Sequence, residues 1–573
     1  MEFGYTKIKN NHKRQKHNKT KKLRIIPLGG CEEVGRNMTV FEYGKDIVIL
    51  DMGVQFPEED MPGIDFVIPN TRYLHGKEKN IRGVIFSHGH LDHIGAAPIL
   101  LEKLGNPPII GMDLTLALIK HRQEDHQKGS AKKLRAIPVK NISQTVKLGS
   151  FTIRFFRVEH SIVDAVGTII ESPAATVIHP GDWTLDRTPE GKPTVDYSQL
   201  KSLPRPTVLM LESLGSVNTK RSGNSEEMHK NLYQLIEGAP GRVIVGTFSS
   251  QIERTKWIIE AAQKLGRKVA LDGYSMKMNI DIARRLGYIK TNPDVLIDIK
   301  KIKNYLPRQI IVICTGAQGE KNAVFSRIIN KTHRHIQLRR DDTIIFSSSV
   351  IPGNERAIQR IKDNMYRQSD HVFHNEVMDV HVSGHANRED IVEMLKTIQP
   401  DYFIPVYANH YMLKEAAMLA QKNGFLKDRI IVPDNGSIIE ISHQSAQVLK
   451  KKAPSNYVFV DGLGISDTQN VVLRDRQVLA EDGMVVVIVS IDSTTGKLTH
   501  SPDLISRGFV FLKENKQLIE ELRGRAQKAA QRAGRRSWPD KNQIRNAIRD
   551  DLGKAILAKT HKRPMILPVI MDV

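Results

Sequence analysis

The sequence predicts a layered α/β protein of two or three domains. The chain has 573 residues, which is more than one hydrophobic core usually supports. From Leu23 onward, short β-type runs broken by glycine alternate with helical segments, and this alternation is typical of layered α/β domains. The same pattern begins again near Ser213, so a second α/β domain is expected there.

The first domain is predicted from four strand-type runs and a helical one. The runs "LRIIPLGG", "TVFEYG", "DIVILDMG" and "IRGVIFSHGH" are rich in β-branched and aromatic residues and end in turn residues, which indicates strands. The segment "AAPILLEKLG" predicts a helix. Residues 1–22 are polar and basic without periodicity, so a disordered basic tail is expected.

Two further units follow. The stretch "GRVIVGTFSSQIERTKWIIEAAQKLGRKVALDG" predicts a strand, a turn, an amphipathic helix and a second strand. The run "KKKAPSN", which begins at Lys450, indicates a linker. Beyond it, "QVLAEDGMVVVIVSID" and "SRGFVFL" predict strands, and "QLIEELRGRAQKAAQRAG" predicts a helix. A small C-terminal α/β unit is therefore expected.

Composition limits the partners and the compartment. Lysine and arginine number 85 against 63 acidic residues, a net charge of +22, which favours a polyanionic partner such as nucleic acid. The longest apolar runs have only strand length, so no membrane partner is expected. The N-terminus lacks the apolar segment of a signal peptide. The only two cysteines, Cys31 and Cys314, fit a reducing cytoplasm.

One short stretch, "GVIFSHGHLDHIGAAPIL", concentrates metal-binding side chains. His88, His90, Asp92 and His93 fall within six residues, directly after a predicted strand. In an extended exit from that strand, the first two imidazoles point the same way, and the second pair faces a neighbouring position. Burying four such groups without a cation would be costly. The stretch therefore predicts metal binding, with room for two ions.

Further ligands are available at other strand ends. His160 follows "FTIRFFRVE", Asp182 follows "ATVIH", and Asp51 ends "DIVIL". Taken singly, such a histidine is more often structural and such an aspartate is an ordinary turn residue. Their shared position at strand ends, where α/β folds build sites, links them to the histidine cluster. The imidazoles suit zinc, but manganese suits the carboxylates equally well. The sequence therefore leaves the identity of the metal open.

These motifs resemble a known family. "SHGHLDH", with Asp51, His160 and Asp182, resembles the motif set of the metallo-β-lactamase fold. "GTFSSQIERTKWIIEAAQKLGRKVALDGYSM", "CTGAQGEKNA", "FSSSVIPGNE" and "HVSGHANREDI" resemble the β-CASP insertion of nucleic-acid-processing enzymes. "VVLRDRQVLAEDGMVVVIV" and "SRGFVF" resemble the C-terminal domain of bacterial ribonuclease J. The resemblance to the ribonuclease J family runs from about Leu23 to the end.

The resemblance implies a fold, an activity and partners. Residues 23–212 and 386–446 would form a metallo-β-lactamase αββα sandwich, with a β-CASP domain inserted at 213–385. A linker at 447–459 and a C-terminal α/β domain at 460–573 would follow. The implied activity is 5′–3′ exonuclease and endonuclease cleavage of single-stranded RNA, in mRNA decay and rRNA maturation. The enzyme would be cytoplasmic, a homodimer or homotetramer through its C-terminal domain, with two divalent ions, zinc first and manganese or magnesium as alternatives.

The resemblance also implies roles for residues. One metal would be held by His88, His90 and His160, and the second by Asp92 and His93. Asp182 would bridge both metals, and Asp51 would orient the ligand loop. Two further positions match β-CASP motifs. Glu212 matches the first motif, which is acidic, and His385 matches the second. A substrate phosphate would be gripped by His381, Ser383, Gly384 and His385, and the catalytic residues would be Asp92, Asp182 and His385.

One motif departs from the family. Where ribonuclease J has a histidine in a "PVHGE" context, this chain reads "FIPVYANHYML", with Tyr407 at that place and His410 three residues on. Either His410 replaces the missing ligand of the second metal, or that metal is held more weakly. The sequence leaves both alternatives open.

Two other functions compete with RNA cleavage. A small-molecule hydrolase, such as a thioester hydrolase, could use the same metal core, but the inserted block at 213–384 and the charge of +22 argue against a small substrate. The other alternative is an RNA-binding scaffold that has lost catalytic activity because Tyr407 stands in place of the family histidine. The retained ligands of the first metal argue against it.

Overall fold

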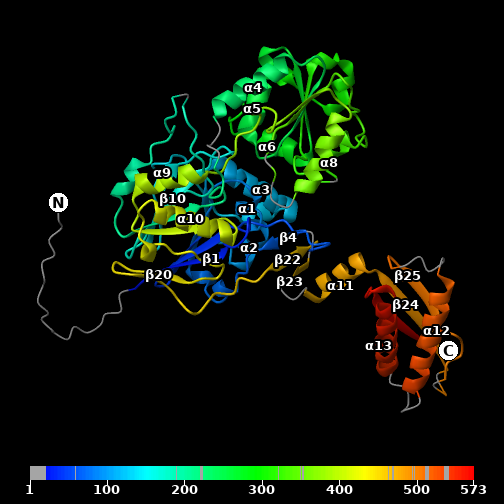
Figure 1. The fold of residues 1–573 in the computed structure, drawn as a ribbon. Coiled ribbons are helices and arrows are strands. Elements are labelled where there is room, and N and C mark those ends of the chain that lie inside the picture. Colours follow the sequence, from blue (N-terminus) through cyan, green and yellow to red (C-terminus); the bar gives the residue numbers. More distant parts are fainter. Residues whose placement is uncertain are drawn as a thin grey trace, which may run out of the picture. The chain divides into compact units, whose positions relative to one another are not determined.

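The structure, a computed structural model, describes residues 21–573 except 59, 189, 220–223, 321, 349, 351–353, 463, 467–469, 493, 496, 510–514 and 535–540. The chain forms two compact units (Figure 1). The first ends at Gln55, resumes at Pro69 and runs to Asn456. The second consists of Phe56–Ile68 and Tyr457–Val573.

Two mixed sheets form the centre of the first unit. The first sheet has the strand order β21 (Ala446–Val448), β20 (Ile439–Ile441), β1 (Leu23–Gly29), β2 (Met38–Tyr43), β3 (Asp46–Leu50), β5 (Ile81–Ile85), β6 (Ile109–Gly111) and β7 (Ala136–Pro138). The second has the order β19 (Tyr402–Val406), β12 (Thr207–Glu212), β11 (Thr176–His179), β10 (Val166–Glu171), β9 (Phe151–Arg157) and β8 (Val146–Leu148).

The two sheets form a sandwich. They share one buried core, to which the first sheet contributes Ile25, Phe41 and Leu50 and the second Phe151, Val177 and Ile404. The outer face of the second sheet packs against α9 (Arg388–Ile398) and α10 (His410–Lys422). On the other side, α3 (Asp113–His126) contacts β6, β7 and α2 (Ala97–Lys103). This is the expected αββα arrangement.

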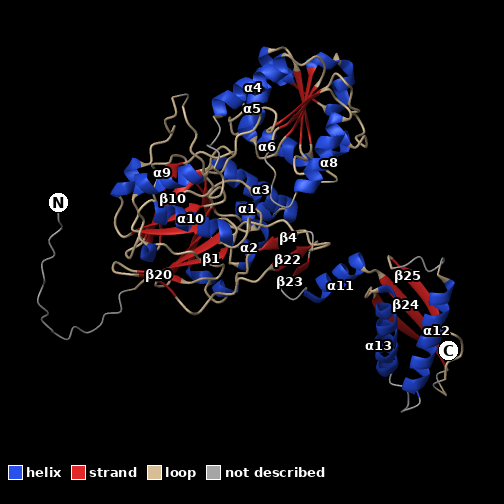
Figure 2. Ribbon diagram, viewed as in Figure 1, coloured by secondary structure: helices blue, strands red, loops and turns tan. Residues whose placement is uncertain are grey.

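An inserted domain lies between β12 and α9. Its parallel sheet has the order β15 (Leu296–Ile297), β14 (Lys268–Asp272), β16 (Ile310–Cys314), β13 (Val243–Gly246), β17 (Thr343–Phe346) and β18 (His371–His374). Helices cover both faces (Figure 2): α4 (Ser225–Glu237), α5 (Ile252–Lys264) and α6 (Tyr274–Arg285), and opposite them α7 (Val324–Ile329) and α8 (Glu355–Tyr366). Gly215 pairs with Asn387 in a β-bridge, so the insertion leaves and rejoins the sandwich at one place.

The second unit holds two small sheets. One has the order β23 (Gly464–Ser466), β22 (Val458–Asp461) and β4 (Phe66–Ile68), and α11 (Asn470–Glu481) follows it. The other has the order β25 (Asp503–Arg507), β24 (Met484–Ile491) and β26 (Met565–Asp572), and one face packs on α12 (Lys516–Gly534) and α13 (Lys541–Thr560).

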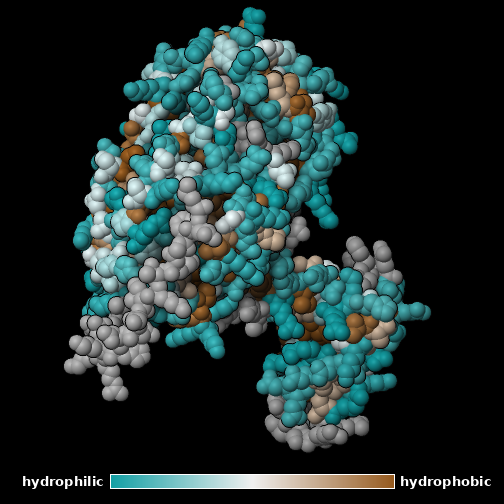
Figure 3. Space-filling model, turned by 60° about the vertical axis from the view of Figure 1, so that its left-hand side comes forward, coloured by the Kyte–Doolittle hydropathy of each residue, from teal (hydrophilic) through white to brown (hydrophobic). Residues whose placement is uncertain are grey.

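Short helices complete the described elements. α1 spans Leu91–Ile94. The 3₁₀ helices are η1 (Arg72–Leu74), η2 (Glu78–Asn80), η3 (Ser130–Lys133), η4 (Ser198–Ser202), η5 (Pro293–Val295), η6 (Ile299–Asn304), η7 (Pro307–Gln309) and η8 (Lys427–Arg429). None of the helices in the described ranges combines the length and apolar composition that crossing a bilayer requires. Figure 3 shows hydrophilic residues over most of the visible surface, with hydrophobic ones scattered between them.

The fold class is confirmed, and three details differ from the sequence-based expectations. The segment Phe56–Ile68 lies in the second unit, because β4 pairs with β22. The expected linker at 447–459 is largely packed on the first unit, where Ala453 is buried and donates a backbone hydrogen bond to Gly436. Gln477 to Glu481, expected as strand, belongs to α11. Residues 1–20 of the expected tail lie outside the described range; Lys22 forms an ion pair with Glu440.

Candidate metal centre

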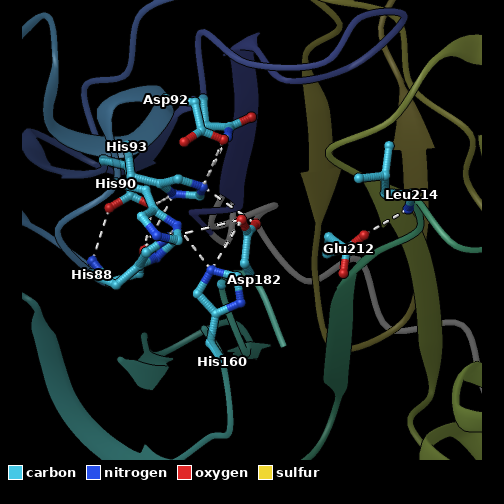
Figure 4. Close-up of polar contacts among 12 residues, drawn as sticks. His88, His90, Asp92, His93, His160, Asp182, Glu212 and Leu214 are labelled. Atoms are coloured by element: carbon cyan, nitrogen blue, oxygen red, sulfur yellow. Dashed lines mark hydrogen bonds and ion pairs between the residues drawn. The ribbon is translucent and has the colours of Figure 1, made fainter. Parts of the chain in front are cut away.

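The predicted ligands lie together because the strands that carry them end at one edge of the sandwich. His88 and His90 follow β5, His160 follows β9, and Asp182 follows β11. Figure 4 shows their side chains pointing toward one another. Asp51 follows β3, the neighbour of β5 in the sheet. The strand ends therefore gather side chains that are far apart in sequence.

A first group consists of His88, His90, His160 and Asp182, whose ligand atoms lie within 4.8 Å of one another. His90 Nδ1 lies 3.1 Å from His88 Nε2 and 2.9 Å from His160 Nε2. Asp182 Oδ2 lies 3.8 Å from each of the same two Nε2 atoms. Three ring nitrogens and one carboxylate oxygen thus face a common point.

In two of the three rings, those of His88 and His160, a hydrogen bond fixes which nitrogen faces that point. Ser87 Oγ donates to Asp51 Oδ2 at 2.8 Å and lies 3.0 Å from His88 Nδ1. Because the Ser87 hydroxyl proton is used for Asp51, the Ser87 oxygen accepts the proton on His88 Nδ1. The lone pair of His88 Nε2 therefore stays free. His160 Nδ1 donates to the Gly384 carbonyl at 2.6 Å, which leaves its Nε2 free in the same way. Asp51 is fully buried and also accepts from the Ser87 backbone N–H.

A second group consists of Asp92, His93 and Asp182, so Asp182 belongs to both groups. His93 Nδ1 lies 2.8 Å from Asp51 Oδ2. On the other side of the ring, Nε2 lies 3.2 Å from Asp182 Oδ1 and 3.5 Å from Asp92 Oδ2. One imidazole is therefore surrounded by three carboxylates.

The electrostatics of both groups suit cations. Burial and the neighbouring imidazoles lower the pKa of His160 to about 3, and burial is the largest cause of the fall of the His90 pKa to about 4. These rings are neutral at pH 7 and keep the lone pairs that a metal requires. Burial alone would lower the pKa of His93, but the surrounding carboxylates hold it well above its usual value. That position attracts positive charge, which a divalent cation would supply in place of a proton. The donor set therefore fits divalent metal ions.

Two residues that the resemblance assigns to β-CASP motifs border the groups. Glu212 ends β12, is buried, and accepts from the Leu214 N–H at 2.7 Å (Figure 4). His385 Nδ1 lies 3.8 Å from Glu212 Oε2 and 4.0 Å from Asp182 Oδ2. Burial lowers the pKa of His385, but these carboxylates outweigh it and raise the pKa to about 9. These carboxylates therefore favour the protonated form of His385 beside Asp182.

The rest of the "HVSGH" segment reaches from the inserted domain to the first group. Gly384 lies against His160, and a Cβ at this glycine would come within 2.8 Å of His160 Nδ1. Glycine is therefore required for this close approach. Ser383 Oγ accepts from the His385 N–H at 3.1 Å. His381 is buried, with Nδ1 2.7 Å from Arg254 Nη1.

The structure does not bring His410 to either group. It is the first residue of α10, its side chain is 47% exposed, and its Nδ1 lies 3.8 Å from Asp434 Oδ1. With Glu32 these residues form a separate surface group. Tyr407, which follows β19, takes the buried position instead, and its ring centroid lies 5.4 Å from that of His93. His410 is therefore not among the residues grouped with Asp92 and His93, contrary to the replacement alternative.

Two contributors were missed in the sequence. Ser87 adjoins the histidine cluster, but a serine there gives no signal apart from its place before His88. Asn37 comes from the loop between β1 and β2, and its Nδ2 lies 3.0 Å from His93 Nε2 and 3.3 Å from Asp92 Oδ2. A single buried asparagine in a glycine-rich loop carries no spacing pattern that would have identified it.

Known family models match four successive parts of the chain. The metallo-beta-lactamase superfamily matches residues 32–212, and the ribonuclease J beta-CASP domain matches 240–365. A Zn-dependent metallo-hydrolase RNA specificity domain matches 374–433, and the ribonuclease J C-terminal domain matches 471–573. These matches confirm the resemblance seen in the sequence motifs.

Curated relatives match nearly the whole chain. "Ribonuclease J2" of Bacillus subtilis is 32% identical over 97% of this chain and 100% of its own. "Ribonuclease J 1" of Streptococcus pyogenes is 35% identical over 96% of this chain and 98% of its own. A "Ribonuclease J 2" of Staphylococcus aureus is 31% identical over 97% of this chain and 99% of its own. A solved protein of unknown function from Enterococcus faecalis shares the fold, with a TM-score of 0.51 and 14% identity over 75% of this chain and all of that one.

Proposed function

Because the chain belongs to the ribonuclease J family of metal-dependent hydrolytic nucleases, we propose that it degrades single-stranded RNA from the 5′ end and also cleaves internally. The observation that carries this proposal is the pair of ligand groups that share Asp182, beside Glu212 and His385 of the inserted domain. The net charge of +22 supports a polyanionic substrate. The cellular roles proposed with it are mRNA decay and rRNA maturation.

The residues suggest a division of labour in hydrolysis. Divalent ions held by the two groups would supply Lewis acidity and water activated near neutral pH. Asp51 and Ser87 hold the rings of His88 and His93 in the orientation that keeps their Nε2 atoms facing Asp182. His385 Nδ1 lies 4.0 Å from Asp182 Oδ2, and we propose that its protonated ring donates to the substrate phosphate or to the leaving oxygen.

We propose two divalent ions per chain, zinc first, with manganese or magnesium as alternatives. The imidazole-rich first group suits zinc, and the carboxylates of the second suit manganese or magnesium as well. Since His410 lies in a different group, the second ion would be held by Asp92, His93 and Asp182 alone. It would therefore be bound more weakly than the first ion, which has four possible ligands.

Two measurements on single-stranded RNA test the function. One measures the dependence of cleavage on metal, and the other compares substrates that differ only in their 5′ end. Removal of metal with a chelator should abolish cleavage of single-stranded RNA, and added zinc or manganese should restore it. A 5′-monophosphate should be degraded faster than a 5′-triphosphate, because the "HVSGH" segment offers a compact set of donors sized for one phosphate. Cleavage that persists after complete metal removal would overturn the metal mechanism, and equal rates on both ends would overturn the end preference.

A separate test concerns the second ion. His410→Ala should leave the bound metal per chain unchanged, since His410 contacts neither group, whereas Asp92→Asn should lower it. Metal content measured by mass spectrometry, together with the metal concentration for half-maximal cleavage, distinguishes the two variants. Loss of metal in His410→Ala would restore the replacement alternative.

A second candidate function is an RNA-binding member of the family with weakened catalysis. The observation that favours it is Tyr407, whose buried ring lies against His93 where the family has a ligand histidine. RNA binding without metal-dependent cleavage in the chelation test would support this candidate over the first.

We also propose self-association and a cytoplasmic location. One face of the β25–β24–β26 sheet packs on helices, while the opposite face exposes Leu567, Val569 and Met571. An exposed apolar sheet face supports a homodimer or homotetramer through this domain, which light scattering of the intact chain would test. Both cysteines are free thiols, which suits a reducing cytoplasm.

A further inference from the structure

The loop of residues 158–165 joins β9 to β10 and carries the ligand His160. Ile162 in this loop is buried and packs against Gly89, the residue between the first two histidine ligands. A Cβ added at Gly89 would come within 3.3 Å of Ile162 Cδ1. The loop therefore contacts the other ligand segment and also supplies a ligand of its own, so a shift of the loop would disturb the first group.

Two contacts from the inserted domain hold the two ends of this loop. Near its start, His160 Nδ1 donates to the Gly384 carbonyl. Near its end, Tyr288, which follows α6, donates its hydroxyl proton to Asp164 Oδ2 at 2.5 Å. The loop that carries a metal ligand is thus fixed at both ends by the domain that the resemblance assigns to RNA processing.

Asp164 joins three parts of the chain through one carboxylate oxygen. Besides the Tyr288 hydroxyl, Asp164 Oδ2 accepts from the Leu114 N–H at 3.0 Å. Leu114 lies in the first turn of α3, where backbone N–H groups have no partner within the helix and a carboxylate is favourable. Asp164 therefore links the ligand loop to α3 and to the inserted domain, and α6 of that domain also contacts α3.

The backbone of Asp164 needs these contacts. Its φ of 67° lies in the left-handed region, which residues other than glycine adopt at a cost in free energy unless the surrounding structure holds them there. Tyr288 is half-buried, and burial together with the bond to Asp164 raises the pKa of its hydroxyl. Tyr288 therefore stays protonated at neutral pH and remains a donor to the carboxylate.

We propose that Tyr288 is a positioning residue of the first metal group, which holds Asp164 and thereby keeps the 158–165 loop where His160 Nε2 faces the metal. The proposal rests on the proposed function, because it concerns the metal centre at which RNA would be cleaved. Both contacts of the loop require the inserted domain to be docked on the sandwich. By linkage, metal bound at the first group should in turn stabilise that docking.

The test measures zinc binding, so it does not depend on turnover. Full-length protein freed of metal is titrated with zinc in competition with a chromophoric chelator. Tyr288→Phe keeps the ring and removes the hydroxyl, and it should weaken binding of the first zinc equivalent by about tenfold, the lower end of the loss seen when the partner of a metal ligand is removed. Hydrogen exchange of residues 158–165, followed by mass spectrometry, should be faster in this variant than in wild-type protein.

The matched control is Tyr274→Phe, which removes another tyrosine–aspartate contact between the same two domains. The Tyr274 hydroxyl lies 3.2 Å from both carboxylate oxygens of Asp125, near the C-terminal end of α3 and not on the ligand loop. This variant should keep the wild-type zinc affinity. A loss as large as that of Tyr288→Phe would show that domain docking in general, and not the hold on the ligand loop, sets the affinity, and would overturn the proposal.

A second pair of variants tests the acceptor. Asp164→Asn keeps an oxygen for Tyr288 and suits a left-handed backbone, so it should retain more zinc affinity than Asp164→Ala. Thermal unfolding of the metal-free variants shows whether each is folded. Unchanged affinity in Tyr288→Phe, or equal affinities in the two Asp164 variants, would overturn the proposal. Wild-type protein that binds zinc but does not cleave RNA would overturn the proposed function and leave this proposal standing.

Discussion

Replacement of His88 by alanine is expected to remove metal from the first group and to lower RNA cleavage by more than about 100-fold. Loss of a residue that merely supports a ligand typically costs 10–100-fold, and His88 faces the common point directly. The fold should persist, because the His88 side chain contacts other site residues, among them Ser87, His90 and Asp182. Metal content and single-turnover cleavage, with circular dichroism on the same samples, measure the effect.

The control for this variant is His75→Ala, an exposed histidine of the same domain that lies outside both ligand groups. It should keep both metal and activity. Near-normal turnover in folded His88→Ala protein would exclude the first group as the reaction centre. Unfolding of that variant would be visible in the dichroism, and His90→Ala then provides the same test from a less buried position.

Replacement of Arg242 by alanine is expected to destabilise the inserted domain by about 3–5 kcal/mol, the cost of breaking a buried ion pair and leaving one charge behind. Arg242 Nε and Nη2 lie 2.8 and 2.5 Å from the two carboxylate oxygens of Asp342, which is fully buried. Arg242 Nη2 also donates to the Gln337 carbonyl at 2.6 Å. Urea denaturation, followed by a probe within the inserted domain, measures the loss.

The matched control is Arg340→Ala, which removes an exposed ion pair of the same domain. Arg340 and Asp370 are 2.9 Å apart, but their side chains are 72% and 64% exposed. Solvent screens such a pair, so the expected loss is at most about 1 kcal/mol. Equal losses in the two variants would show that burial of Asp342 adds nothing to the strength of its pair.

The sequence by itself determined the parts of this protein that depend on local pattern. The spacing of His88, His90, Asp92 and His93 after an apolar run indicated a metal site, because such a cluster has few other stable uses. Strand and helix periodicity located β1, β5, β13 and α5. It failed at Gln477 to Glu481, where a short apolar segment suits either a helix or a strand.

Only the tertiary structure decided which distant groups meet. Gly384 contacts His160 across 224 positions of sequence, and His381 contacts Arg254 across 127. Periodicity shows which face of an element a side chain occupies, but it does not show which strand ends and loops are brought to the same edge. For that reason the shared position of Asp182, the exposure of His410 and the partner of Arg254 follow from how the sheets pack.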